Sequence, residues 1–129
     1  MKKILIVNAN YYKNISGNLI IGAKNMLKKD KTSIKIINVP GVFEIPITIS
    51  KNIKKYDAFL ALGCVIKGQT PHFDFISQAS TNAIMRLSVE SKKPIGNGII
   101  TCLNKDQALQ RKNKGGEAAQ AVLNVLTQK

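Results

Sequence analysis

The sequence has few of the residues that usually mark catalytic or binding chemistry. It contains no tryptophan, two cysteines, one histidine and two arginines in 129 residues, and aromatic residues make up 5% of the chain. Without clusters of cysteine and histidine, the ligand spacings of zinc fingers are excluded, and we expect no metal ion. The apolar runs are only a few residues long, which excludes a membrane-spanning helix.

Acidic residues are also scarce, and the chain is strongly basic. Seven Asp and Glu stand against twenty Lys and Arg, which gives a net charge of +13. Such a charge suits a nucleic-acid or acidic-membrane partner. Eighteen of the basic residues, however, are lysines spread along the chain, without an arginine-rich helix or an aromatic-studded strand. We therefore interpret the charge as a lysine-rich solvated surface; the alternative is that its field attracts small phosphorylated anions. We predict no nucleic-acid and no membrane partner.

The two cysteines indicate a reducing compartment. Cys64 and Cys102 each lie inside an apolar run and form no CxxC pair, a pattern typical of packed, reduced thiols. The apolar run at residues 4–7 is too short for the core of a signal peptide. We expect a cytoplasmic protein.

Length and patterning predict one α/β domain covering residues 1–129. The chain is 44% hydrophobic and 21% charged, as globular proteins are. Strand-like runs cover 3–9, 33–39, 58–66 and 95–101. Helix-like runs cover 16–29, 44–55, 70–91, a short stretch after 104, and 117–126. Because this alternation builds parallel strands joined by right-handed crossovers, we expect a flavodoxin-like open sheet of four parallel strands with helices on both faces.

Short sequence signals set the expected helix starts. Caps are expected from side chains that accept hydrogen bonds, and prolines are tolerated in first turns. The signals are Ser16, Thr70 and Asn104 as N-cap residues, Pro46 and Pro71 in first turns, and Gly115-Gly116 ahead of the last helix.

The open-sheet architecture locates the candidate site. In such sheets, ligands bind beyond the carboxyl ends of the strands, where the loops 8–16, 40–44, 67–72 and 102–104 meet. Tyr11 and Tyr12 offer either surface packing or a stacking wall for a flat heterocycle. Glu44, at a helix start, either binds a ligand or complements the helix dipole.

The loop 67–72 has the composition of a phosphate cradle. Gly68 lets the backbone approach a ligand, Thr70 adds a hydroxyl, and free amides at a helix start favour an anion. The alternative is an ordinary strand-to-helix turn capped by Thr70. His72 is either a proton-transfer group or a structural hydrogen-bonding residue. Of the two arginines, Arg111 suits a phosphate, whereas Arg86, in mid-helix, suits a surface ion pair.

Five segments, in order along the chain, resemble the lumazine synthase family. They are VPGVFEIP (39–46), YDAFLALGCVIKGQTPHFD (56–74), PIGNGIIT (94–101), DQALQR (106–111) and NKGGEAA (113–119). The first two correspond to the family patterns VPGAFEIP and YDAxxxLGxVIRGxTxHxD. Asn97 stands where the family often has Phe, so one wall of the ring pocket is expected to be polar.

The resemblance implies a transferase of riboflavin biosynthesis that needs no cofactor. Its reaction condenses 5-amino-6-(D-ribitylamino)uracil with 3,4-dihydroxy-2-butanone 4-phosphate and gives 6,7-dimethyl-8-ribityllumazine, phosphate and water. His72 would shuttle protons. The residues implied for the pyrimidine and ribityl chain are Tyr11, Val42, Phe43, Glu44, Cys64, Val65, Ile66, Asn97 and Lys114. Those implied for the butanone phosphate are Gln69 and Thr70, joined by Arg111 of a neighbouring subunit.

The resemblance also implies an assembly. A homopentamer with active sites at subunit interfaces is the expected minimum, and whether pentamers build a larger shell stays open. The expected first strand begins at Lys3, so we expect no counterpart of the amino-terminal segment that pairs with an adjacent subunit in the family. Two other functions compete: an archaeal-type riboflavin synthase, which dismutates two lumazines, and a basic flavodoxin-like module that binds nucleotides or nucleic acid.

Overall fold

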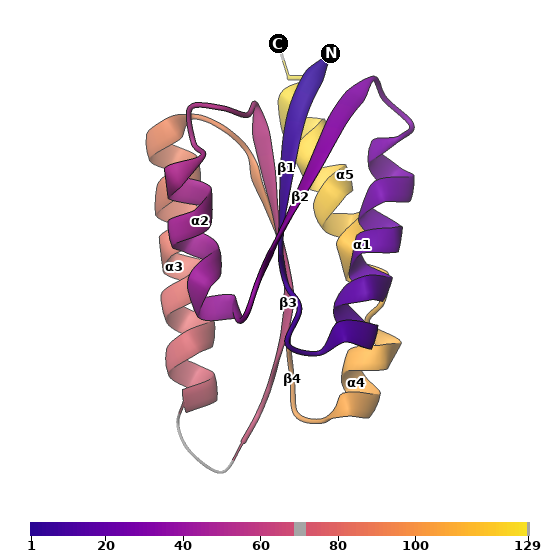
Figure 1. The fold of residues 1–129 in the computed structure, drawn as a ribbon, viewed down its shortest axis with the longest axis vertical. Helices are drawn as coiled ribbons and strands as arrows, with labels where there is room; N and C mark the ends of the chain where they lie inside the picture. Colours follow the sequence, from indigo (N-terminus) through magenta and orange to yellow (C-terminus); the bar gives the residue numbers. More distant parts are fainter. Residues whose placement is uncertain (69–71, 129) are drawn as a thin grey trace.

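A single parallel sheet organises the chain, of which the computed structural model describes residues 1–68 and 72–128. The strands are β1 (Lys2–Ala9), β2 (Thr32–Val39), β3 (Ala58–Ile66) and β4 (Ile95–Cys102). Their order is β2-β1-β3-β4, and every neighbouring pair is parallel (Figure 1). The expected four-stranded parallel sheet is therefore confirmed, and β2 and β4 are its edges.

Helices cover both faces of this sheet. On one face lie α1 (Lys13–Leu27), α4 (Lys105–Gln110) and α5 (Lys114–Leu126), and on the other lie α2 (Ile45–Lys51) and α3 (His72–Ser91) (Figure 1). A single 3-10 turn, Val42–Glu44, leads into α2. None of these helices, in the part of the chain that the structure describes, is long and apolar enough to cross a membrane.

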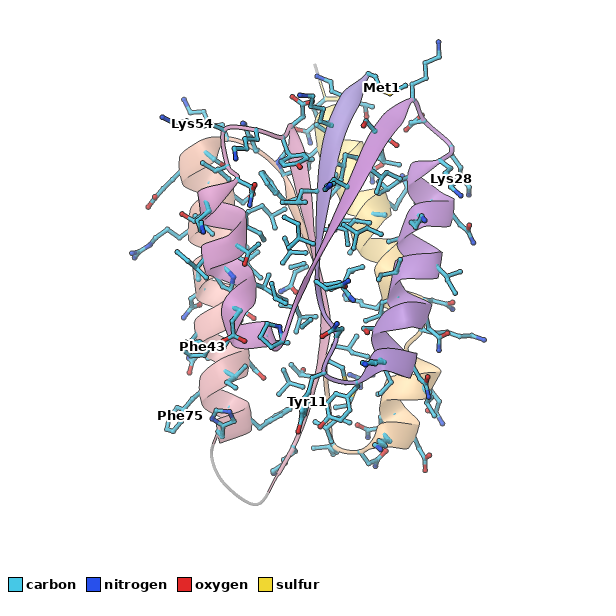
Figure 2. All side chains as sticks on the ribbon, viewed as in Figure 1. Met1, Tyr11, Lys28, Phe43, Lys54 and Phe75 are labelled. Carbon is cyan, nitrogen blue, oxygen red and sulfur yellow. The ribbon has the colours of Figure 1, made fainter. Side chains whose placement is uncertain are left out.

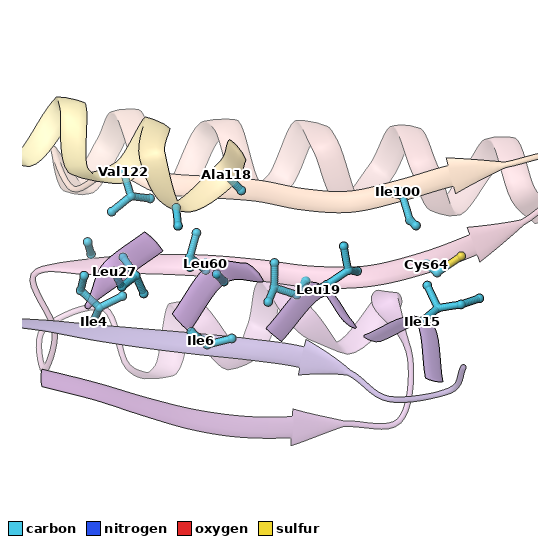
Figure 3. Packing of buried hydrophobic residues seen from close by; sticks show 14 of the residues in the cluster. Ile4, Ile6, Ile15, Leu19, Leu27, Leu60, Cys64, Ile100, Ala118 and Val122 are labelled. Atoms are coloured by element: carbon cyan, nitrogen blue, oxygen red, sulfur yellow. The ribbon is translucent and has the colours of Figure 1, made fainter. Parts of the chain in front are cut away.

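The alternation of side chains along β1 divides the core into two clusters. In the first, Ile4 and Ile6 lie with Leu60 of β3 against Leu19 of α1 and Val122 of α5 (Figure 3). On the opposite face, the second cluster packs under α2 and α3. Its buried strand members are Leu5, Val7, Ala9, Val39, Phe59 and Ala61. Because β3 is covered on both faces, it carries the nearly continuous apolar run expected of a central parallel strand.

Two helix boundaries differ from those expected. Helix α1 begins at Lys13 rather than at Ser16, because the Ser16 N–H already donates to the Tyr12 carbonyl, at 2.9 Å. The Ser16 side chain is buried, and its hydroxyl donates to the Lys13 carbonyl instead of capping the helix. Helix α2 ends at Lys51, four residues early, where the side-chain amide of Asn52 donates to a carbonyl of the last turn.

The start of α5 was also predicted wrongly. The helix begins at Lys114 rather than Glu117, so Gly115 and Gly116 lie inside its first turn. A Cβ atom on Gly115 would overlap the carbonyl oxygen of Leu19. The glycine pair therefore lets α5 approach the backbone of α1 closely, and it does not break the helix.

Other local signals are confirmed. Asn104 caps α4 by accepting a hydrogen bond from the Gln107 N–H at 2.9 Å, and the Gln107 side chain accepts one from the Leu103 N–H at 2.8 Å. Pro46 lies in the first turn of α2. The expected cap of α3 at Thr70 and Pro71 lies outside the described residues. That helix is described from His72.

Glycine substitutions test the close approach of α1 and α5. We expect Gly115→Ala to destabilise the protein by about 1–3 kcal/mol, because the added methyl group forces the two helices apart. Gly17→Ala is the matched control, since no described atom lies within 4 Å of its Cβ position. It should stabilise helix α1 by about 0.5–1 kcal/mol. Urea-denaturation midpoints at one protein concentration measure both changes, and a Gly115→Ala midpoint equal to wild type would contradict the packing.

Candidate active site

An aromatic ledge lies at the carboxyl end of the sheet. Tyr11 follows β1 directly, and its side chain is 71% exposed. Its ring meets that of Tyr12 edge to face, with centroids 4.9 Å apart and planes at 75°. Tyr12 packs in turn against the core, so it supports the exposed ring from below. Phe43 is 67% exposed and projects at the same end (Figure 2). Two flat apolar surfaces are thus held open to solvent.

The loop after β2 is fixed by the packing of Val42. This side chain is buried and lies over Gly63 of β3, where a Cβ atom would come within 3.0 Å of it. The Glu44 N–H donates to the Gly41 carbonyl at 3.1 Å, which closes the 3-10 turn. With Val42 pointing inward, Phe43 is turned outward. Glu44 precedes the first residue of α2, a position where a carboxylate complements the helix dipole.

The end of β3 presents its side chains to opposite faces. Cys64 and Ile66 lie on the α1 and α5 side, and Val65 lies on the α2 and α3 side. The Cys64 thiol is buried, and this burial, with a smaller effect of the neighbouring Cys102 thiol, raises its pKa to about 12. Cys64 is therefore a packed thiol and no nucleophile.

The loop 67–72, predicted to bind phosphate, is described only in part. Gln69 and Thr70 lie outside the described residues. Lys67 and Gly68 are exposed, and no described atom lies within 4 Å of the Cβ position of Gly68. Packing therefore does not require a glycine there. His72 is exposed as the first residue of α3.

A second group of expected site residues lies along the free edge of β4. Arg111 ends α4, and its Nη1 donates to the Thr101 carbonyl at 3.0 Å. Arg111 and Lys114 line a hollow of about 380 Å³ together with Thr101 and Glu117. Asn97 accepts a hydrogen bond from the Ile99 N–H at 3.0 Å through its side chain. This bond occupies a backbone donor that a further strand would otherwise take.

The structure thus divides the predicted site residues into two groups. Around the carboxyl ends of β1, β2 and β3 lie the residues that we call the ring group: Tyr11, Val42, Phe43, Glu44, Cys64, Val65, Ile66 and His72. On the edge of β4 lie the edge group: Asn97, Arg111 and Lys114. Among the described residues, those lining the hollow beside Arg111 include no member of the ring group.

Two further residues of this region were missed from the sequence. Tyr12 was considered only as part of a tyrosine pair, but it supports Tyr11, and burial raises its pKa, so that its phenol stays neutral. Asn8 is 98% buried near the end of β1. Its amide donates to the Asn38 side chain at 3.1 Å, and its Oδ1 has no hydrogen-bond partner among the described residues. A polar residue inside an apolar strand was the available signal for Asn8.

Arg86 and the two cysteines have the structural roles that the sequence predicts. Arg86 lies 3.9 Å from Glu90 on the exposed side of α3, which confirms the expected surface ion pair. Cys64 and Cys102 are both free and buried, as expected. No group of three or more His, Cys, Asp or Glu in residues 1–68 and 72–128 is arranged to hold a metal ion.

Comparison with known proteins identifies the family. The family model of 6,7-dimethyl-8-ribityllumazine synthase matches residues 1–129, the whole chain. The chain belongs to this family. It is 45% identical to the 6,7-dimethyl-8-ribityllumazine synthase of Bartonella tribocorum over 128 residues, which cover 93% of this chain and 85% of the relative.

Two further relatives carry the same name. The chain is 42% identical to the protein of Zymomonas mobilis over 136 aligned positions, which cover all of this chain and 97% of the relative. It is 46% identical to the protein of Bartonella henselae, with 93% and 83% of the two chains covered. The similarity thus extends over nearly the full length of proteins named as lumazine synthases, and it agrees with the resemblance seen in the sequence.

Thiol chemistry tests the environment of Cys64. At pH 8.5 we expect iodoacetamide to alkylate Cys64 at least about a hundredfold more slowly in the native protein than in the unfolded one, because burial raises the thiol pKa to about 12 from 9.0. Peptide mass spectrometry separates Cys64 from Cys102. The raised pKa stabilises the folded state fully below pH 9, and this contribution is lost as the pH rises from 9 through 12. Equal native and unfolded rates would contradict the buried thiol.

Proposed function

We propose that the chain condenses 5-amino-6-(D-ribitylamino)uracil with 3,4-dihydroxy-2-butanone 4-phosphate, as a 6,7-dimethyl-8-ribityllumazine synthase of riboflavin biosynthesis. Membership of the family carries this assignment. The chemistry of the two substrates fits the two groups of residues described above. One substrate is a flat ring with a hydroxylated chain, and the other is a small ketone with a phosphate.

The ring group suits the pyrimidine substrate. The exposed faces of Tyr11 and Phe43 offer a surface on which a planar heterocycle can stack. The carboxylate of Glu44, the next residue after Phe43, is assigned the hydrogen bonds from the ribityl hydroxyls. Backbone groups at Cys64, Val65 and Ile66 bind the polar edge of the ring. A buried thiol with a raised pKa adds no competing nucleophile near the substrate amine.

His72 is assigned the proton transfers of the reaction. The 5-amino group attacks the ketone carbon and loses water to give an imine, so protons leave nitrogen and reach the departing oxygen. Loss of a proton from carbon then expels phosphate, and attack by the ribitylamino nitrogen closes the second ring with loss of water. An exposed imidazole at the start of α3 can serve each step at neutral pH.

The edge group suits the phosphate of the second substrate. Arg111 is exposed, and one side of its guanidinium is fixed by the Thr101 carbonyl, so its remaining donors point to solvent. A guanidinium binds phosphate through two parallel hydrogen bonds. Lys114 adds charge in the same hollow. Gln69 and Thr70 are proposed to complete the phosphate site from the neighbouring chain.

A site divided in this way requires more than one copy of the chain. The free edge of β4 is one candidate contact. Another is the outer surface of α2 and α3, where Ile47, Met85 and Val89 are each more than half exposed, as apolar side chains at protein interfaces often are before assembly. We infer a homopentamer in the cytoplasm in which the edge group of one subunit faces the ring group of the next.

Proximity is the main source of rate acceleration in this account. Two substrates held in reactive orientation gain about 7–11 kcal/mol, whereas one general acid or base contributes about 10²–10⁴-fold. The carbonyl–amine condensation needs little further activation. The division of the site between two subunits therefore matters more to the rate than the single imidazole.

The direct test mixes both substrates and follows the absorbance of the lumazine product. Product should form with both substrates, and the lumazine alone should give no riboflavin, which separates this reaction from that of an archaeal-type riboflavin synthase. In the same assay, Arg111→Ala should raise the KM for the butanone phosphate by about ten- to a hundredfold, because a charge-assisted pair is lost. The KM for the pyrimidine should stay within about twofold.

Arg86→Ala is the matched control. Arg86 is equally cationic but lies on the exposed side of α3, paired with Glu90, and its loss should change neither KM once sedimentation shows that the variant keeps the wild-type assembly. An unchanged butanone phosphate KM in Arg111→Ala would refute the phosphate role of this residue. Riboflavin formation from the lumazine alone would refute the proposed reaction.

A further inference from the structure

The fold gathers lysines that are far apart in the sequence. Every turn that leads from a helix into a strand returns to the amino end of the parallel sheet, the end at which Met1, Lys28 and Lys54 lie (Figure 2). The segments at this end are residues 2–3, 28–31, 51–57 and 90–93. Their basic residues are Lys2, Lys3, Lys28, Lys29, Lys31, Lys51, Lys54, Lys55, Lys92 and Lys93. We call them the basic end.

The basic end carries far more charge than the fold itself requires. Its ten lysines face three carboxylates, Asp30, Asp57 and Glu90, an excess of seven positive charges. One of the three, Asp57, accepts a hydrogen bond from the Lys3 N–H at 2.7 Å. Four helices end here, and each contributes about −0.5 charge through its dipole, so dipoles offset only about two of the seven charges. Among the described residues, carboxylates and helix dipoles thus leave more than half of this excess without compensation.

Nearly all of these lysines are free for another molecule. Lys93 is the exception, because its ammonium group donates to the Ile53 carbonyl at 2.6 Å and so serves the turn before β3. The other nine are exposed. The exposed aromatic rings, in contrast, lie at the carboxyl end of the sheet (Figure 2). A ligand of the basic end is therefore bound by charge, without stacking.

We propose that the basic end binds the phosphate backbone of a nucleic acid without reading its sequence. Flexible lysines on separate turns can each neutralise a phosphate, and the release of condensed counterions supplies the driving force. These segments contain no arginine and no exposed aromatic ring, so bidentate arginine readout and base stacking are not the source of binding. These lysines are scattered along the sequence, a distribution that by itself suggests only a solvated surface. Because the strands are parallel, the fold brings them together into one cluster.

Two other polyanions fit the same observations less well. Stable membrane attachment needs an apolar or lipid anchor besides a basic patch. In residues 1–3, 28–31, 51–57 and 90–93, Met1 is the one exposed apolar side chain, which is too little apolar surface for such an anchor. An acidic protein partner would need a desolvated centre of aromatic or apolar residues. A backbone of repeating phosphates needs only the charges.

The basic end lies opposite the proposed active site, so the two can be tested separately. The experiment measures the anisotropy of a labelled 20-nucleotide poly(U) on titration with the full chain, between 50 and 200 mM KCl. We expect the affinity to fall steeply, with a log–log slope of about −3 or steeper, because each neutralised phosphate contributes about −0.7 for single strands. Sedimentation confirms that the variants keep the assembly of the wild type.

Two triple variants of equal net charge locate the binding surface. Lys29→Gln/Lys31→Gln/Lys54→Gln removes charge from the basic end, and Lys35→Gln/Lys105→Gln/Lys112→Gln removes it elsewhere. The first should make the slope shallower by about two and weaken binding at least tenfold at 100 mM KCl, while the second should keep the slope within about 0.7 of wild type.

Three results would overturn the proposal. They are an equal loss in both triple variants, which would mean attraction by net charge alone; tighter binding to phosphatidylglycerol vesicles than to poly(U); and tighter binding to polyglutamate. Lumazine formation by the first triple variant should equal that of wild type. A failure of nucleic-acid binding can thus be distinguished from a failure of the proposed enzyme activity.

Discussion

The parallel direction of the four strands is the constraint on which the rest of the structure depends. A parallel strand must be followed by a crossover to the opposite end, and here each crossover contains a helix. All strand-to-helix loops therefore meet at one end of the molecule and all helix-to-strand turns at the other. The aromatic ledge and His72 belong to the first set, and the basic end to the second. One topological rule thus separates the candidate active site from the proposed nucleic-acid surface.

The same sheet separates the two groups of predicted site residues within one chain. Ring-group residues follow β1, β2 and β3, whereas Arg111 is turned along the outer edge of β4 by its hydrogen bond to the Thr101 carbonyl. The Asn97 side chain closes off the Ile99 N–H on that edge. These contacts prepare the edge to meet another surface. In an assembly, a neighbouring subunit would then bring a phosphate-binding cation to the ring group, which no loop of a single subunit does.

Much of the fold could be predicted because strand-like and helix-like runs alternate along the chain and each run is recognisable from its local sequence. The strand β3 is apolar on both faces and was located to the residue, and the cap at Asn104 follows from side-chain chemistry within four residues. The expected helix bounds were wrong where packing between segments distant in the sequence determines them. Gly115 suggests a helix break by itself, and only contact with the backbone of α1 shows why it lies inside a helix.

The candidate site shows the same limit. Its residues were found through family motifs, yet their separation into a ring group and an edge group depends on strand order, which the sequence pattern leaves open. The burial of Cys64, the support of Tyr11 by Tyr12 and the clustering of lysines likewise arise from long-range packing. Family motifs named the site residues and assigned Arg111 to a neighbouring subunit, and the roles of all of them stay predictions.

The central claim is that each active site combines the ring group of one subunit with the edge group of another, and subunit mixing tests it most directly. The measurement is the specific activity of assemblies made by co-expressing His72→Ala and Arg111→Ala chains in equal amounts. In a closed ring, about a quarter of the interfaces would pair an intact His72 with an intact Arg111. At a butanone phosphate concentration well below the wild-type KM, where the raised KM of Arg111→Ala also suppresses the activity of that variant, the mixture should recover to about a quarter of wild type. Activity no higher than the mean of the two separate variants would contradict a shared site.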